Sequence, residues 1–219
     1  MSLSGEAWLR SPERRRWDVT YAAVYLPVFG SLAIAGGMAV AAIDGHGPLF
    51  RQRRAGRDNL PFTILKLRTM PPDTPHVPSN GHGDERATKL GRILRKYTLD
   101  EAPQLINVIK GDMSLVGPRP LLECHIEAIA ETLPSSLAEE WLEARSICRP
   151  GIINPFTVSM ARYGEPYSNE TRVRSEIAFA EYASREVDRL MVRDTVASLL
   201  GYRHPSVETE SVLQSGMQA

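Results

Sequence analysis

The residues of this 219-residue chain that are best placed to do chemistry are two adjacent carboxylates, Asp100 and Glu101. Neighbours on a helix point about 100° apart, so they would not form the facing carboxylate pair of a glycosidase. Acidic residues in a first helical turn commonly cap free amides and favour the helix dipole. Beside Arg92, Arg95 and Lys96, however, the same carboxylates could serve as a nucleophile or as metal ligands. The residues alone leave both interpretations open.

Further cations could bind phosphate near this pair. Lys66 and Arg68 are two residues apart on a predicted strand and would share one face of it. Arg119 lies between Pro118 and Pro120, which restrict the backbone on both sides and suit bidentate phosphate binding. A solvated strand face, a contact with lipid headgroups or an exposed turn would give the same pattern. The number of cations around one carboxylate pair favours a phosphate site.

The hydrophobic spacing predicts helices on both sides of the carboxylates. Residues 98–101 have the form of a capping box, which predicts that a helix starts there and ends at Gly111. An amphipathic basic helix is predicted before it, with an apolar face formed by Leu90, Ile93, Leu94 and Tyr97. The remaining predictions are a strand at 62–69, a loop at 71–83, an extended segment at 114–116, helices at 121–147 with a break near Pro134, and a helix at 171–200.

One segment is apolar enough to enter a membrane. Residues 19–43 carry no charge, and at about 1.5 Å per helical residue they are long enough for a hydrocarbon layer of about 30 Å. Pro27 lies inside the segment and predicts a kink. Arginines flank both ends, and basic residues favour the cytoplasmic side, so a bent helix that enters and leaves by one face is expected. The alternative is a buried, alanine-rich core helix.

The composition limits the class of function. The chain has 26 basic and 26 acidic residues and 42% hydrophobic residues, which suits one substantial core. Residues 51–97 nevertheless carry 11 basic and four acidic residues, which predicts an anionic partner for this half. No aromatic stacking platform accompanies the cations, so no nucleic acid is expected as a partner. Cys124 and Cys148 have no spacing typical of a zinc site or a disulfide framework.

Four groups of residues form long motifs in one order along the chain, namely 47–52, Gly56 with 62–70, 99–105 with Asn107 and Val108, and 111–120. These motifs resemble the successive signatures of the bacterial sugar transferases known as monotopic phosphoglycosyl transferases. The similarity runs from about Arg16 to Leu200, and the chain is most similar to the small, PglC-like form of the family.

The resemblance implies an α+β fold that is mostly helical, with a small sheet, a re-entrant membrane helix kinked at Pro27 and amphipathic helices at the interface. It also implies a place on the cytoplasmic face of the bacterial inner membrane, in contact with membrane lipids. The expected organisation is a basic N-terminal segment at 1–18, the re-entrant helix at 19–43, a cytoplasmic catalytic domain at 44–202 and a disordered tail at 203–219.

The reaction implied by the resemblance moves a sugar 1-phosphate from a UDP-sugar to a polyprenol phosphate and releases UMP, as a first membrane step of glycoconjugate assembly. Asp100 would be the nucleophile that forms an aspartyl phosphosugar, Glu101 would assist, and both would lie at a Mg²⁺ ion. Lys66, Arg68, Arg95 and Arg119 are the candidate phosphate contacts. The rival hypothesis is a membrane-surface protein that binds polyprenol phosphate or nucleotide sugar without turnover.

Two positions depart from the family pattern. The family usually has a serine before the helix proline, whereas this chain has Leu26, and we expect the Ser31 hydroxyl to satisfy the carbonyl that Pro27 frees. After Arg149, Pro150 and Gly151 the family commonly continues into a Thr-Gly-Trp-like run, whereas this chain continues with 152–154 as Ile-Ile-Asn. This region is expected to contact the nucleotide or the sugar.

Overall fold

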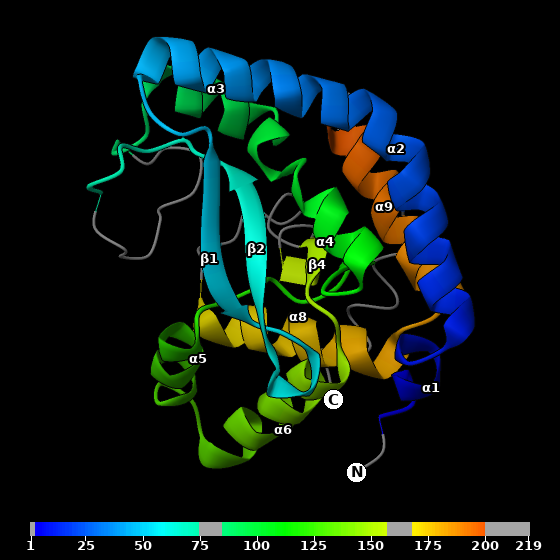
Figure 1. Ribbon diagram of the computed structural model, residues 1–219. Coiled ribbons are helices and arrows are strands. Elements are labelled where there is room, and N and C mark those ends of the chain that lie inside the picture. Colours follow the sequence, from blue (N-terminus) through cyan, green and yellow to red (C-terminus); the bar gives the residue numbers. More distant parts are fainter. Residues whose placement is uncertain (1–2, 75–84, 157–167, 200–219) are drawn as a thin grey trace.

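The computed structural model describes residues 3–74, 85–156 and 168–199 (Figure 1). Within these residues the chain is mostly helical, with two short two-stranded sheets, so the predicted α+β class is confirmed. The expected tail at 203–219 and most of the loop at 71–83 lie outside the described residues. The helices are α1 Glu6–Leu9, α2 Pro12–Ala39, α3 Lys89–Lys96, α4 Gln104–Lys110, α5 Glu123–Ala130, α6 Ser135–Ile147, α8 Asn169–Tyr182 and α9 Arg185–Leu199.

The strands form two separate ladders. β1 (Leu49–Ala55) pairs with β2 (Pro61–Leu67) in antiparallel register, which places Phe50 opposite Lys66. β3 (Ser114–Val116) pairs in parallel with β4 (Gly151–Ile153). The predicted strand at 62–69 and the extended segment at 114–116 are therefore confirmed, although Arg68 lies just beyond the end of β2.

The long helix α2 begins at Pro12, where the Ser11 hydroxyl accepts a hydrogen bond from the Arg14 amide. It continues through Pro27 without interruption and ends in a π-helical turn, Val40–Asp44. Figure 1 shows the ribbon bending about midway along its length, so the proline bends the helix and does not divide it. The Ser31 hydroxyl donates to the Pro27 carbonyl at 2.6 Å, and not to the carbonyl one turn earlier that the proline leaves free.

Both ends of α2 are held by the rest of the protein. Near its start, the Arg14 guanidinium forms a buried ion pair with Asp188 of α9 at 2.8 Å and donates to the Val116 carbonyl at 2.7 Å. After its last turn, the Asp44 carboxylate accepts a hydrogen bond from the Thr88 hydroxyl at 2.8 Å. Figure 1 shows α2 lying over α3, α4 and α9, so the helix lies along the domain over its whole length.

The outer face of α2 is apolar and exposed. By length and composition it is a helix that could cross a membrane, and only 17% of its most apolar window is buried within the described chain. Large side chains on this face are more than 40% exposed, namely Val24, Val28, Leu32, Ile34 and Met38. The alternative of a buried core helix is therefore wrong, because the apolar residues of α2 mostly face outward.

Three predictions about the helices need correction. The predicted helix at 171–200 is two helices, because Ala183 adopts an extended conformation between α8 and α9. The predicted apolar face of α3 is divided: Leu94 is buried under α2, whereas Ile93 and Tyr97 are more than half exposed. The helix predicted to start at 98–101 is a separate turn followed by α4, as described below. The break near Pro134 is confirmed, since α5 and α6 lie on either side of it.

Candidate active site

The carboxylates lie in a 3-10 turn, Leu99–Glu101, between α3 and α4. Thr98 has a φ of 56° in the left-handed region, and its side chain caps nothing, so the predicted capping box is wrong. A threonine cap occurs instead one helix earlier, at the start of α3, where the Thr88 hydroxyl accepts from the Gly91 amide at 2.9 Å. After the turn, α4 runs to Gly111, whose φ of 96° ends the helix as predicted.

The turn is held against the inner side of α2. Leu99 packs against the apolar cluster that contains Ala102 with Ala33 and Val40 of α2. The Asp100 carboxylate is buried between these two anchors, at 8% exposure. A carboxylate is thus placed close under the apolar helix.

Glu101 is joined to β2 by an ion pair. Its Oε1 lies 2.6 Å from Lys66 Nζ, and both side chains are less than one-fifth exposed. Asn107 of α4 sets this geometry, because its side chain accepts from the Leu65 amide at 3.0 Å and donates to the Thr63 carbonyl at 2.8 Å. The amide therefore fixes β2 against α4, and Lys66 is brought to the carboxylate.

A small cavity of about 30 Å³ opens beside this ion pair. Arg119 enters it from the turn after β3, and the Arg119 carbonyl is held by Arg145 Nη2 at 3.0 Å. The turn sits tightly on β4, since a Cβ on Gly117 would lie 2.2 Å from the Arg149 carbonyl oxygen. The remaining lining residues are Arg54, Ile64, Gln104, Pro120, Gly151, Ile152 and Asn154.

Two hydrogen-bond donors that line the cavity have no acceptor in the described part of the chain. The buried Nε of Arg54 and the buried Nε2 of Gln104 have no hydrogen-bond partner among the residues that the structure describes. Burial and the nearby charge of Arg119 lower the pKa of Arg54 to about 10. Unpartnered buried donors cost free energy unless a ligand or water accepts from them. With Lys66 and Arg119, they make the cavity suited to an anion.

The two adjacent carboxylates are in different electrostatic environments. Burial raises the pKa of Asp100, the charge of Glu101 raises it further, and Lys66 and Arg95 oppose both effects. Burial would also raise the pKa of Glu101, but the charges of Lys66 and Arg119, the hydrogen bond from Lys66 and the nearby Gln104 amide hold it below its usual value. Glu101 is thus the firmly ionised partner, and Asp100 is the one whose protonation responds to its surroundings.

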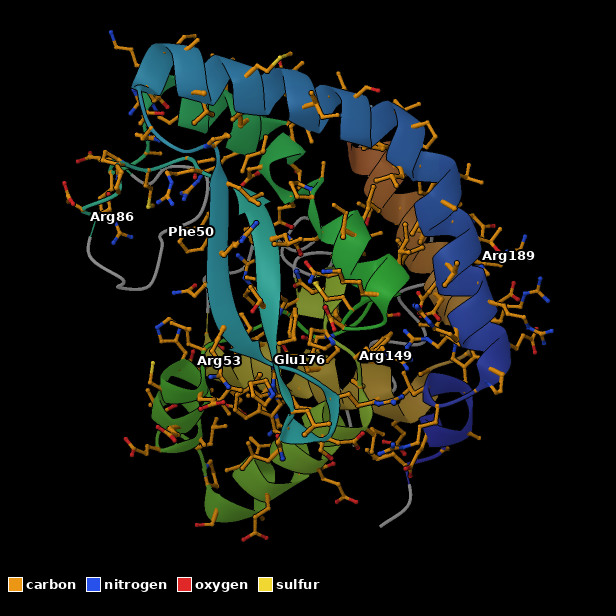
Figure 2. The ribbon with its side chains drawn as sticks, viewed as in Figure 1. Phe50, Arg53, Arg86, Arg149, Glu176 and Arg189 are labelled. Carbon is orange, nitrogen blue, oxygen red and sulfur yellow. The ribbon has the colours of Figure 1, made fainter. Side chains whose placement is uncertain are left out.

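The structure divides the predicted phosphate contacts. Lys66 and Arg119 line the cavity together with Glu101. The charge of Arg95 opposes the rise in the Asp100 pKa, and the Arg95 Nε donates to the Thr69 hydroxyl at 2.9 Å. Arg68 instead donates to the Gly47 carbonyl at 3.0 Å and lies over the Phe50 ring at 5.8 Å. Figure 2 shows Phe50 beside β1, on the side away from α4.

Sequence reasoning missed Arg54 and Gln104 as site residues. The signal for Arg54 was the alternation along β1, which places it on the same face as Gln52, and its Nη2 donates to the Gln52 side-chain oxygen. Gln104 was hidden within the helix-forming motif of α4. Ile152 and Asn154, in the region that departs from the family pattern, also line the cavity.

The residues fit a magnesium ion only in company with substrate. The described residues contain no group of three or more His, Cys, Asp or Glu side chains that could hold a metal. Mg²⁺ commonly takes one or two carboxylates and completes its shell with phosphate oxygens and water. Asp100 and Glu101 supply two hard carboxylate donors, and the cations beside them would bind the phosphates.

Comparison with known protein families identifies the class. The family model described as bacterial sugar transferase matches residues 10–202, which include every element of the site. The chain belongs to the bacterial sugar transferase family. The predicted family is therefore confirmed, and with it the prediction of a transferase.

Three relatives illustrate the similarity. The UDP-glucose:undecaprenyl-phosphate glucose-1-phosphate transferase of Caulobacter vibrioides is 38% identical over 85% of this chain and 69% of its own length. The UDP-N-acetylgalactosamine-undecaprenyl-phosphate N-acetylgalactosaminephosphotransferase of Aeromonas hydrophila is 30% identical over 85% of this chain and 43% of its own length. The exopolysaccharide production protein ExoY of Rhizobium meliloti is 31% identical over 85% of this chain and 84% of its own length.

Proposed function

We propose that this protein transfers a sugar 1-phosphate from a UDP-sugar to a polyprenol phosphate. The observation that carries the proposal is the Lys66–Glu101 ion pair, which borders a donor-rich cavity and adjoins the buried Asp100 carboxylate. The names of the relatives give UDP-sugars as donors and undecaprenyl phosphate as acceptor, which supports the same pair of substrates here. Exopolysaccharide production by the ExoY relatives supports a role in glycoconjugate assembly.

The proposed chemistry has two displacements at one phosphorus. The Asp100 carboxylate attacks the sugar-bearing phosphorus, a bond forms to its oxygen, and the bond to the UMP oxygen breaks with its electron pair. UMP leaves the site. A phosphate oxygen of the polyprenol phosphate then attacks the same phosphorus, and the carboxylate of Asp100 is restored. The covalent step separates a water-soluble donor from an acceptor that arrives through the lipid.

The other residues act on charge and position. Lys66 and Arg119 would bind the donor diphosphate in the cavity, with Gln104 and Arg54 donating from its buried side. Glu101 would hold Lys66 in place. Arg95 would keep the Asp100 carboxylate ionised. Arg68 would act indirectly, because it binds the Gly47 carbonyl in the segment that leads into β1.

Magnesium belongs to this proposal as a bound cofactor. Asp100 and Glu101 would hold the ion together with the diphosphate, and the ion would offset the negative charge that develops on the phosphate oxygens.

We also propose that α2 is a re-entrant helix on the cytoplasmic face of the inner membrane. Its outer apolar face is exposed, and both of its ends are bonded to one folded domain through Arg14 and Asp44. A helix held in this way cannot leave one end on the far side of a bilayer. The flanking arginines support the placement less directly, because Arg14 is 1% exposed and Arg15 donates to the Val108 and Ile109 carbonyls at the end of α4. Tags at Met1 and Ala219 should both be protected from external reagents in intact cells.

The transferase is distinguished from a protein that only binds these ligands by the Asp100→Asn variant. Release of UMP from UDP-sugars should fall by about 10³-fold or more, because the amide cannot act as the nucleophile. The matched control is Asp73→Asn, at an exposed aspartate, which should keep full turnover. Burial raises the pKa of Asp100, so its ionised form opposes folding at neutral pH, and the Asp100→Asn protein should melt no lower than the wild type. Full turnover by a folded Asp100→Asn protein would exclude the proposed nucleophile.

A further inference from the structure

A ladder of aromatic rings follows the inner side of α2, from Trp17 near the start of the helix to Phe29, which packs against the cluster under the carboxylate turn. Trp17, Tyr21, Tyr25 and Phe29 are four residues apart, so they lie on one face of the helix. Successive ring centroids are 4.7, 6.1 and 6.1 Å apart. Trp17 is 8% exposed, whereas the other three rings are only half-buried. The proposed reaction uses none of these rings.

A groove of about 240 Å³ lies beside this ladder, between α2 and α9. Its two walls differ in chemical character. Trp17, Tyr21 and Tyr25 form the α2 wall. On α9 the apolar residues Val192 and Val196 alternate with Arg189 and Arg193. The groove shares no lining residue with the cavity at Glu101, so it is a second site.

The charges at the groove belong to a stripe of arginines on α9. Arg185, Arg189 and Arg193 recur every four residues and therefore follow one face of the helix. Arg185 pairs with Glu13 at 3.4 Å, and Arg193 Nε lies 3.2 Å from Asp194, although the Arg193 side chain is 51% exposed. Arg189 is exposed, and Figure 2 shows it at the edge of α2. The groove thus has a cationic rim over an aromatic and aliphatic wall.

We propose that this groove binds one anionic phospholipid, with the phosphate at Arg189 and Arg193 and the start of an acyl chain along the aromatic rings. Charge complementarity selects an anion, and the apolar wall selects a ligand with a hydrocarbon part. The groove also adjoins the exposed apolar face of α2 at Val24 and Val28, so a bilayer that covers this face brings lipid to the groove. Tyrosine and tryptophan are enriched at the headgroup level of membranes, which is the depth this placement gives to Trp17 and Tyr21.

This inference rests on the membrane placement of α2 in the proposed function and is independent of the transfer chemistry. The bound lipid would fasten the first half of α2 to α9, beside the Arg14–Asp188 pair. Its failure and the failure of the transferase proposal are distinguishable, because lipid retention is measured without a nucleotide sugar.

The test compares lipid retention by two charge-matched variants of the full chain. The protein is reconstituted into nanodiscs of phosphatidylcholine with or without phosphatidylglycerol, released into detergent, and examined by native mass spectrometry for retained lipid. The wild type should retain phosphatidylglycerol in preference to phosphatidylcholine. Arg189→Gln with Arg193→Gln should weaken that retention by about fivefold for each arginine removed. The control is Arg51→Gln with Arg53→Gln, at exposed residues of β1. Figure 2 shows Arg53 and Arg189 on opposite sides of the molecule in this view.

A second variant tests the apolar wall without changing charge. Val192→Trp places a ring in the groove and should expel the lipid while both arginines remain, which the same native mass spectrometry measures.

Fluorescence quenching tests the position of the acyl chain. Quenching of Trp17 fluorescence by phosphatidylglycerol brominated on its acyl chains should exceed quenching by brominated phosphatidylcholine at equal mole fraction in the wild type. The excess should vanish in the double arginine variant, with a Trp17→Phe protein giving the background from the other tryptophans.

Three results would overturn the inference. Equal losses in the α9 and β1 variants would show general attraction to an anionic surface. Displacement of retained lipid by inorganic phosphate alone would show a site for a free anion. Equal quenching by the two brominated lipids would show that no headgroup is selected.

Discussion

Two ion pairs join distant parts of this chain, and they differ in their burial and in what surrounds them. Arg14 and Asp188 have side chains that are 1% and 0% exposed, and Trp8 Nε1 adds a hydrogen bond to Asp188 at 2.9 Å. Lys66 and Glu101 have side chains that are 19% and 16% exposed, and a cavity of about 30 Å³ lies beside them. The first pair closes a packed interface between α2 and α9. The second leaves charge available at an opening.

This difference separates a structural pair from one that is prepared for a ligand. Breaking a fully buried pair leaves an uncompensated charge inside the protein, whereas a pair beside an opening can recruit water or a ligand. The account therefore predicts that changes at Arg14 affect folding, and that changes at Lys66 affect turnover.

The largest expected effect is the loss of stability in Arg14→Met. Removal of the guanidinium leaves Asp188 buried without its cation and should lower the free energy of unfolding by about 3–5 kcal/mol. Thermal and denaturant unfolding measure the change. The control is Arg16→Met, at an exposed residue of the same helix, which should change stability by less than about 0.5 kcal/mol. Similar stabilities of the two variants would remove the distinction between the pairs.

Lys66→Met should show the opposite pattern. The free energy of unfolding should change by less than about 1 kcal/mol, because the pair is partly exposed to the cavity. The kcat/KM for UMP release should fall by about 10²–10³-fold, since a cation that binds the transferred phosphate is lost. A variant that loses stability and keeps its turnover would contradict the proposed role.

Gln104→Leu tests whether the unpartnered donors face the substrate. Removing an amide that has no partner for its Nε2 should leave the free energy of unfolding unchanged or slightly raised. The KM for the UDP-sugar should rise by about tenfold, the cost of one lost hydrogen bond to a charged group. An unchanged KM would place the donor outside the site.

The smallest expected effect is a shift in pH dependence. The rate of the first displacement should fall as pH drops through the raised pKa of Asp100, because the protonated carboxyl cannot attack. Lys66→Met should move this acid limb to higher pH, since Lys66 lowers that pKa. Glu101→Gln should move it to lower pH, because the charge of Glu101 raises the same pKa. The residual rate of UMP release by each variant, measured against pH, tests these shifts. Shifts in the same direction for the two variants would contradict the assignment of the acid limb to Asp100.

The sequence predicted the local elements around the site well. The alternation at 62–69, the glycine at 111 and the proline at 134 each act on their own neighbours, and β2, the end of α4 and the division between α5 and α6 follow. The prediction for the turn at the carboxylates was wrong because the residue types at 98–101 match the capping-box pattern. The left-handed backbone at Thr98 depends instead on the packing of Leu99 and Ala102 under α2.

What the sequence could not provide is convergence over long separations. Arg14 forms an ion pair with Asp188, 174 residues further along the chain, and no local sequence pattern predicts that pair. Arg54 and Gln104 reach one cavity only because the β1–β2 register and the Asn107 hydrogen bonds bring a strand and a helix together. The strand spacing predicted that Arg68 shares a face with Lys66. However, β2 ends at Leu67, and the Arg68 side chain donates to the Gly47 carbonyl.

The central claim is that Asp100 carries the sugar phosphate between donor and acceptor. The direct test incubates the protein with magnesium and UDP-sugars in the absence of polyprenol phosphate, quenches the mixture with acid, and maps the adduct by peptide mass spectrometry. The account predicts the mass of a sugar phosphate on the peptide that contains Asp100, its loss when polyprenol phosphate is added, and its absence in Asp100→Asn. UMP release in the presence of acceptor without any adduct on that residue would contradict the account.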